Sequence, residues 1–135
     1  MNSQKAKLCK GKYVFISHST KDTWIAEHIA ADIKRKGRES GVGTFIDSKD
    51  IGPAELIDES IRRNLRECSK FIVLLSSASV NREWVLIETG AAWGLRKPIV
   101  ALLDKIAPSQ IPKAIAPRKA IDLNDLEKNL AYITR

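Results

Sequence analysis

Residues 70–95 read KFIVLLSSASVNREWVLIETGAAWGL, and this stretch decides the fold. Its first part, KFIVLL at 70–75, is an apolar run of strand length, which is typical of a strand covered on both faces. The polar loop SSAS follows at 76–79, and a helix is predicted from about Asn81 to Leu95. A buried strand that leads directly into a helix is the repeating unit of a parallel α/β sheet.

The same unit recurs on both sides of this stretch. Upstream, strands are predicted at 13–17 (YVFIS) and 43–47 (GTFID). The first strand is followed by an amphipathic helix that ends near Lys36, and its apolar stripe consists of Ile25, Ile29 and Ile33. The second is followed by a helix that begins near Pro53, with an apolar stripe of Ile57, Ile61 and Leu65.

Downstream, a fourth strand is predicted at 98–103 (PIVALL). Three prolines then interrupt the pattern, so a loop with at most a short helix is expected before a short edge strand at 120–121. A closing helix is predicted over 122–133. The alternation favours one parallel sheet with helices on both faces and 70–75 as its central strand. In such sheets ligands bind beyond the carboxyl ends of the strands, where the polar loops 17–20, 47–53 and 76–81 would lie.

Composition narrows the class of protein. The 135 residues carry a net charge of +7, but lysines at 5, 7, 10 and 12 supply +4 of it and leave a mild +3 elsewhere. Residues 1–11 are therefore interpreted as a basic disordered tail and residues 12–135 as one domain, with nucleic-acid binding not expected. No signal peptide and no apolar run long enough for a membrane span is found, and the two cysteines, Cys9 and Cys68, suit a reduced cytoplasmic protein.

The helix after the serine loop contains one residue that does not fit. Glu88 is the only ionisable side chain between Trp84 and Leu95, and glutamate is seldom buried without a partner. Trp84 lies one turn earlier on the same face, near the predicted ligand edge. A flat aromatic ring beside a partly desolvated carboxylate suits a ligand with a planar ring and sugar hydroxyls. The alternative is structural: a paired Glu88 and a Trp84 that belongs to the core.

Several other kinds of site find no support in the sequence. No Gly-x-Ser-x-Gly elbow surrounds the serines, so a hydrolase triad is not indicated, and a capping role for 76–79 is favoured. Neither Gly-x-Gly-x-x-Gly nor a Walker-type phosphate loop occurs. No cysteine and histidine cluster has the spacing of metal ligands.

Three segments resemble the conserved boxes of TIR (Toll/interleukin-1 receptor) domains. YVFISHSTKD at 13–22 is similar to the first box, and FIDSKDIGPAE at 45–55 to the second box, which forms the BB loop. FIVLLSSASVNREWVLIETG at 71–90 resembles the strand, serine loop and W-x-x-x-E helix of the family. The three boxes occur in order and together span most of the chain.

This resemblance implies a flavodoxin-like fold with a five-stranded parallel sheet in the order 2-1-3-4-5. It also implies an enzyme that cleaves NAD at the nicotinamide–ribose bond, giving nicotinamide and ADP-ribose or a cyclic ADP-ribose, with NAD as substrate and no cofactor or metal. Glu88 matches the catalytic glutamate of the family and Trp84 matches an aromatic residue that stacks on a base. The remaining substrate contacts that it implies are Ser17, His18, Ser19, Thr20, Phe45, Asp47, Lys49, Asp50, Gly52 and Ser77.

Two adjacent positions depart from the family pattern. Ser19 and Thr20 stand where some relatives place arginines that hold phosphates, so Lys49 or a neighbouring chain would serve instead. TIR enzymes commonly need two copies, because the BB loop of one chain completes the pocket of another. The implied partners are therefore NAD, other TIR domains that form a homo-oligomer or filament, and a sensor domain or protein, in immune defence or cell-death signalling.

Two other functions remain as alternatives. A non-catalytic TIR adaptor would act only by association with other TIR domains, and it would not need the glutamate. A nucleoside deoxyribosyltransferase-like enzyme shares the sheet and a glutamate near a sugar, but the BB-loop box argues against it. The presence of Glu88, alone in an apolar helix, favours the NAD-cleaving enzyme.

Overall fold

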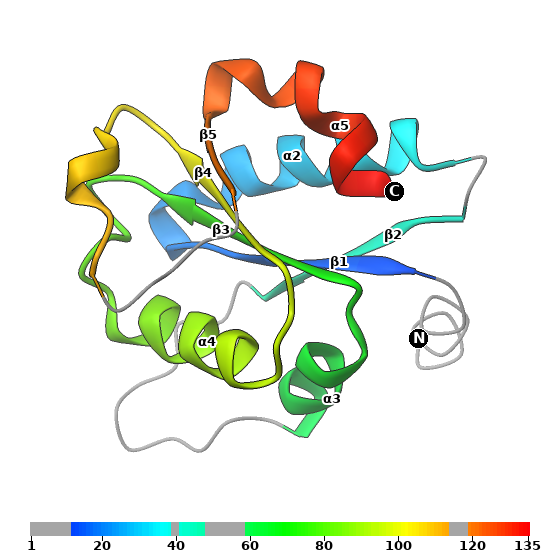
Figure 1. The fold of residues 1–135 in the computed structure, drawn as a ribbon, viewed down its shortest axis with the longest axis horizontal. Coiled ribbons are helices and arrows are strands. Elements are labelled where there is room, and N and C mark those ends of the chain that lie inside the picture. Colours follow the sequence, from blue (N-terminus) through cyan, green and yellow to red (C-terminus); the bar gives the residue numbers. More distant parts are fainter. Residues whose placement is uncertain (1–11, 39–40, 48–58, 114–118) are drawn as a thin grey trace.

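The computed structural model describes residues 12–38, 41–47, 59–113 and 119–135. Five strands form one sheet in the order β2-β1-β3-β4-β5, and every neighbouring pair is parallel (Figure 1). This confirms the predicted strand order and the central place of the KFIVLL strand. The strands are β1 (Tyr13–Ser17), β2 (Gly43–Asp47), β3 (Lys70–Leu75), β4 (Ile99–Leu103) and β5 (Lys119–Asp122).

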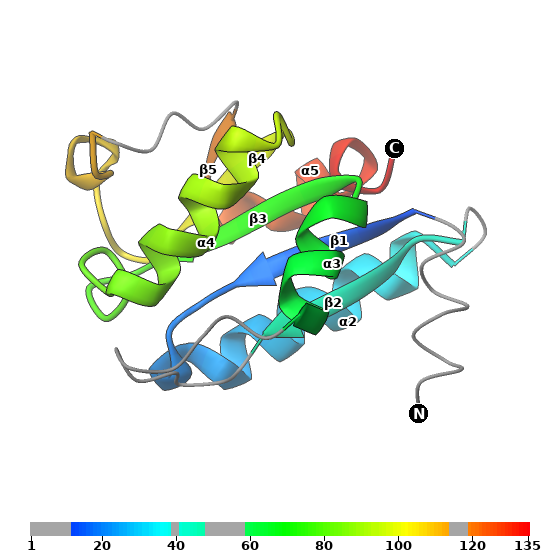
Figure 2. The same cartoon turned by 90° about the horizontal axis from the view of Figure 1, so that it is seen from below.

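Helices cover both faces of the sheet. The four α-helices are α2 (Thr23–Lys36), α3 (Glu59–Glu67), α4 (Glu83–Gly94) and α5 (Leu126–Thr134). In Figure 1, α2 and α5 lie above the sheet and α3 and α4 below it. Figure 2 looks from the α3/α4 side and shows these two helices in front of the strands. Short 3-10 turns complete the chain: η1 (Thr20–Asp22), η2 (Pro108–Gln110) and η3 (Leu123–Asp125).

The all-apolar sequence of β3 follows from its place between these two layers. Ile72 and Leu74 belong to the core under α2 and α5, whereas Phe71, Val73 and Leu75 belong to the core under α3 and α4. Successive side chains of a strand point to opposite faces, so a strand with two covered faces needs apolar residues at every position. All of β3 is buried, as this arrangement requires.

Most element bounds agree with the sequence predictions, and the differences have local causes. The α4 helix begins at Glu83 rather than Asn81, because serine-bonded turns occupy the residues after β3. The predicted closing helix over 122–133 is divided into η3 and α5, with the side chain of Asp122 accepting from the backbone N–H of Asn124. The predicted helix start near Pro53 and the predicted tail at 1–11 lie outside the described residues.

A buried polar network joins the loop after β3 to the turn before α2. The Ser76 hydroxyl donates to Oδ2 of Asp22 over 2.6 Å, and the Ser79 hydroxyl donates to the carbonyl of Leu74 over 2.8 Å. Ser79 Oγ also accepts from the backbone N–H of Ser76 at 2.8 Å. These two serines hold their own loop rather than cap α4, whose N-cap is Arg82 without a side-chain hydrogen bond, and Asp22 is a partner that the sequence did not predict.

Cys68 lies in the core between α3 and β3 as a free thiol. Burial raises the pKa of its thiol to about 11. None of the described helices has the length and apolar character to cross a membrane.

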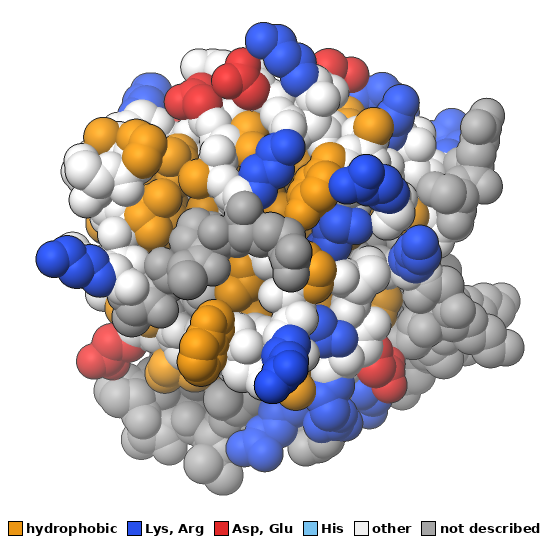
Figure 3. Space-filling model, viewed as in Figure 1, with side chains coloured by type: hydrophobic (Ala, Val, Ile, Leu, Met, Phe, Trp, Pro, Cys, Tyr) orange, Lys and Arg blue, Asp and Glu red, His pale blue; other side chains and the backbone are white. Residues whose placement is uncertain are grey.

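Charge is unevenly distributed over the surface. In the view of Figure 3, Lys and Arg side chains are most numerous in the centre and right of the face, with others at the top and at the left edge. Acidic side chains gather mainly at the top of the same view.

The Asp22–Ser76 bond should be a substantial part of the stability. Because both groups are buried and the carboxylate is charged, we expect Asp22→Ala to lower the free energy of unfolding by about 2 kcal/mol. Asp32→Ala, which removes a solvent-exposed pair with Arg35 in the same helix, should lower it by less than about 1 kcal/mol. Urea denaturation measures both, and equal losses for the two variants would contradict this role of Asp22.

Candidate active site

The candidate site lies where the carboxyl ends of the central strands meet. Ser17 ends β1, and in the strand register it pairs with Asp47 of β2 on one side and Val73 of β3 on the other. The described parts of the three polar loops predicted from the sequence therefore leave the sheet at a common edge, the edge at which open parallel sheets bind ligands.

Ser17 and Glu88 are in direct contact at this edge. The Ser17 hydroxyl donates to Oε1 of Glu88 over 2.6 Å, across 71 residues of sequence. Both residues are buried, with exposed fractions of 0% and 1%. A hydroxyl that donates to a carboxylate at this distance forms a charge-assisted hydrogen bond, so it fixes one carboxylate oxygen in place. The structure thus gives Ser17, a predicted substrate contact, the further role of holding Glu88.

The helix explains why Glu88 is buried. The buried side of α4 consists of Val85, Glu88, Thr89 and Ala92, which follow helical spacing and face the sheet. Three of these four positions suit a core, and Glu88 places a carboxylate among them. The sequence predicted a partly desolvated carboxylate, whereas the structure buries the side chain almost completely. Burial of a carboxylate is unfavourable unless hydrogen bonds replace its water.

Trp84 lies one turn before Glu88 in α4, as predicted. Its side chain is partly buried and packs against the hydrophobic core between the sheet and the α3/α4 layer. It is therefore neither a wholly internal residue nor a free surface residue. Its role as a platform for a base stays a prediction.

The loop after β1 brings three predicted contacts close to Ser17. His18 and Ser19 are buried, at 4% and 2% exposed, and Nδ1 of His18 lies 2.7 Å from the carbonyl of Ser19. A carbonyl only accepts, so Nδ1 carries the proton. Nε2 of His18 is buried and meets no hydrogen-bond partner in the part of the chain that the structure describes. Ser19 Oγ accepts from the backbone N–H of Lys21 and caps η1, which starts at Thr20.

The structure gives less detail about the other predicted substrate contacts. Phe45 of β2 is partly buried, and its ring lies 5.1 Å from that of Phe15 in the core. Ser77 is exposed in the serine loop. Asp47 ends β2 next to Ser17, but its side chain, like the whole of Lys49, Asp50 and Gly52, lies outside the described residues.

Sequence reasoning did not find Asp22 and Ser76 as a pair. In the sequence Asp22 has the position of an acidic residue in a helical first turn, and the two residues are separated by 54 positions. No spacing rule connects them. The only available signal was that both follow strands predicted to be neighbours in the sheet.

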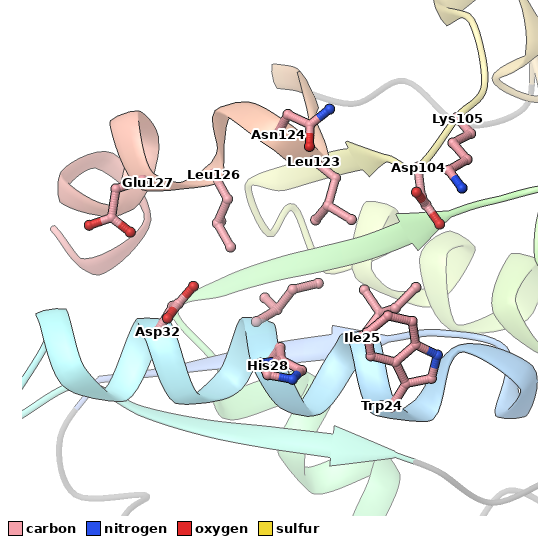
Figure 4. Close-up of a pocket in the computed structure, with 11 residues that line it drawn as sticks. Trp24, Ile25, His28, Asp32, Asp104, Lys105, Leu123, Asn124, Leu126 and Glu127 are labelled. Atoms are coloured by element: carbon pink, nitrogen blue, oxygen red, sulfur yellow. The ribbon is translucent and has the colours of Figure 1, made fainter.

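A separate pocket of about 490 Å³ lies on the opposite face of the sheet (Figure 4). Trp24, Ile25 and His28 of α2 form one wall, and Leu123 and Leu126 form the other. None of the predicted site residues that the structure describes lines this pocket. Within the described ranges, no three His, Cys, Asp or Glu side chains lie close enough together to hold a metal ion.

Known proteins resemble this chain in sequence and in fold. The chain is 27% identical over 117 residues to a probable 2′ cyclic ADP-D-ribose synthase, BdTIR, from Brachypodium distachyon. The match covers 85% of this chain and 51% of the relative, so the chain spans about half the length of that curated protein.

Solved structures share the fold at lower identity. The TIR domains of the activated Roq1 resistosome, which directly recognises the pathogen effector XopQ, superpose with a TM-score of 0.60 at 21% identity, covering 78% of this chain and 64% of that one. A 3-dehydroquinate dehydratase-like protein from Bifidobacterium longum gives a TM-score of 0.56 at 10% identity, covering 91% and 95%. The family description "TIR domain" matches residues 14–133, and the chain belongs to the TIR domain family.

Proposed function

We propose that this TIR domain cleaves NAD at the nicotinamide–ribose bond, with Glu88 as the catalytic carboxylate. The observation that carries the proposal is the buried Ser17–Glu88 hydrogen bond at the carboxyl ends of the strands. A relative named as a probable 2′ cyclic ADP-D-ribose synthase supports an NAD-derived substrate. The proposed reaction takes NAD as substrate and uses no cofactor or metal.

The chemistry requires a negative charge beside the ribose. When the bond from the ribose carbon to the pyridinium nitrogen breaks, its electron pair moves to the nitrogen, and nicotinamide leaves as a neutral molecule. The ribose then develops oxocarbenium character, which a fixed carboxylate stabilises. Attack by water, with loss of one proton, gives ADP-ribose. Attack by a nucleophile of the same molecule gives a cyclic ADP-ribose.

Ser17 acts in this scheme as a positioning residue. Its hydroxyl holds Oε1 of Glu88 at 2.6 Å and so fixes the direction of the carboxylate. A preorganised charge stabilises a transition state better than a mobile one, because it needs no reorientation during the reaction. We assign the polar residues of the same edge, His18, Ser19, Thr20, Asp47 and Ser77, to substrate contact, together with Phe45 and with Lys49, Asp50 and Gly52 of the BB loop.

The burial of Glu88 implies that the enzyme must be activated before it can cleave NAD. Since its side chain is 1% exposed, a ribose can contact the carboxylate only after a local rearrangement. Self-assembly with other TIR domains through the BB loop is our proposed source of that rearrangement. The domain would then act in immune defence, antiphage defence included, or in cell-death signalling in the cytoplasm, under the control of a sensor domain or protein.

The same burial favours a second candidate function. A carboxylate that is fully inside the molecule and bonded to a strand could serve structure alone, and the chain would then be a non-catalytic TIR scaffold. The two functions differ in a direct test. A scaffold at high concentration, or with a crowding agent, assembles but leaves NAD unchanged, whereas the enzyme releases nicotinamide.

Glu88→Gln is the sharpest variant for the catalytic role. The amide keeps the shape and an acceptor for Ser17, so the free energy of unfolding should not fall. Nicotinamide release should fall at least about a hundredfold, because the negative charge is lost. Glu83→Gln, an exposed position in the first turn of the same helix, is the matched control and should retain activity. Full activity of Glu88→Gln would disprove the assignment; Glu88→Ala should be equally inactive.

Ser17→Ala tests the positioning role. With the donor gone, the carboxylate is no longer fixed, and we expect kcat to fall about 10- to 100-fold while KM changes less than about threefold. Steady-state kinetics separate the two constants. If KM rises and kcat is unchanged, Ser17 is a substrate contact and its hydrogen bond to Glu88 is incidental.

Trp84→Ala tests the stacking role. Loss of a base platform should raise KM about tenfold or more, since stacking on an aromatic ring contributes roughly 1–3 kcal/mol per base. Trp84→Phe should restore much of the affinity. Ile87→Ala, at a half-exposed position in the same helix, is the control. An effect of Trp84→Ala on KM no larger than that of Ile87→Ala would rule out stacking.

A further inference from the structure

The edge of the sheet opposite the candidate site carries a row of lysines. In a parallel sheet all strands begin at one edge, and the helices that connect them end there. Four adjacent strands, β1, β3, β4 and β5, each have a lysine at or within two residues of their start. These residues, called here the lysine row, are Lys12, Lys70, Lys97 and Lys119. Neighbouring strands are about 4.8 Å apart, so the row crosses the edge at short intervals.

Two members of the row have a structural function. Nζ of Lys70 donates to the backbone carbonyl of Arg135 at 3.0 Å, and Nζ of Lys97 donates to that of Arg66 at the end of α3. Cations near helix carboxyl ends interact favourably with the helix dipole, so these contacts explain Lys70 and Lys97 without a ligand.

The other cations at this edge are not explained in that way. Lys119 and Arg135 lie 4.8 Å and 4.9 Å from the ring centre of Tyr132, and Lys70 lies 5.5 Å from it. Three cations therefore share one aromatic ring. The pKa of Lys70 is lowered, first by burial and then by repulsion from Lys12 and Arg135, which shows how closely positive charge is gathered here.

Acidic side chains neutralise only part of the positive charge at this edge in the described part of the chain. Glu67 ends α3 there, and Arg35 in the last turn of α2 already pairs with Asp32 at 3.6 Å and with Glu127 at 3.3 Å. The same turn adds two lysines, Lys34 and Lys36, on either side of the paired Arg35. At the opposite edge the signs are mixed: Lys21 and Lys105 stand among Asp104, Asp122 and Asp125.

Exposed apolar side chains lie at the same basic edge. Trp93, in the last turn of α4, is 64% exposed, and Leu95, which caps that helix, is 43% exposed. Arg96 and Lys97 follow directly in the chain. Figure 3 shows hydrophobic and basic side chains interspersed over the α4 side of this face.

From this combination we propose that the basic edge docks on an anionic phospholipid surface. Lysine and arginine near such a surface are attracted by acidic headgroups, and tryptophan favours the boundary between headgroups and acyl chains. Leu95 distinguishes the bilayer from a nucleic acid, because an aliphatic side chain neither stacks on bases nor bonds to them but is favourably buried at a lipid interface. The proposal is independent of NAD cleavage, since none of these residues belongs to the candidate site.

The first experiment measures partition of the full chain onto vesicles. Flotation at about 0.1 M salt compares pure phosphatidylcholine with vesicles containing about 30 mol% phosphatidylserine. Binding should require the anionic lipid and should weaken as salt rises. Each cation near the surface is worth about 1 kcal/mol, or roughly fivefold, so Arg96→Glu should reduce binding about 5- to 25-fold.

Lys105→Glu is the matched control for charge. Arg96 and Lys105 are both exposed and both have a left-handed backbone, with φ of 61° and 60°, but they lie at opposite edges. Lys105→Glu should bind vesicles within about twofold of the wild type. An equal loss in both variants would overturn the proposal, because net charge alone would then account for binding.

The second experiment tests insertion of Trp93. Brominated acyl chains should quench tryptophan emission in the wild type and in Trp24→Phe but much less in Trp93→Phe. Trp24 is 65% exposed at the other edge and is the matched control. Trp93→Ala should also reduce vesicle binding about tenfold.

Three results would overturn the proposal. The first is no binding to anionic vesicles. The second is binding to an oligonucleotide that Arg96→Glu weakens, without binding to vesicles, and the third is self-association without lipid that Trp93→Ala abolishes. The second result would make the edge a nucleic-acid surface, and the third would make it a protein interface. Whether or not the chain binds vesicles, Trp93→Ala should cleave NAD as fast as the wild type. The vesicle experiments therefore test lipid docking alone, and the Glu88 variants test NAD cleavage alone.

Discussion

Parallel pairing of all neighbouring strands, with β3 at the centre, is the constraint on which the rest of the molecule depends. It makes every strand end at one edge and every connecting helix return to the other. The carboxyl ends therefore bring Ser17, the end of β2 and the serine loop together, although these segments are far apart in the sequence. The starts of the strands, with their lysines, are brought together at the other edge by the same rule.

Glu88 is the residue through which this sheet carries the proposed reaction. A carboxylate on the buried side of an apolar helix opposes folding unless other groups replace its water, and the Ser17 hydroxyl does so at 2.6 Å. The contact also links α4 to the first strand of the sheet. Alanine or leucine at this position would pack in a core without such help. The presence of a glutamate is what makes the NAD-cleaving function the better of the two candidate functions.

The sequence predicted those parts of the molecule that depend on local patterns. Strands β1, β2 and β3 have the predicted bounds, because apolar runs bounded by polar loops are local signals. The position of Trp84 one turn before Glu88 follows from helical spacing alone. The Ser17–Glu88 and Asp22–Ser76 bonds could not be predicted in this way, since each joins residues more than fifty positions apart and depends on how α4 and η1 pack on the sheet. The near-complete burial of Glu88 is likewise a result of packing, which no periodicity reports.

The separation of charge between the two edges has a consequence for how the molecule moves. In the described part of the chain, positive charge is concentrated where the strands begin and charge of both signs lies where they end, so these residues contribute an electric dipole along the strand direction. A charged surface exerts a torque on such a dipole before contact and favours one orientation during approach. With the basic edge leading, the carboxyl ends of the strands point back into solution. The molecule would then arrive with its candidate site facing small solutes and neighbouring copies rather than the surface itself.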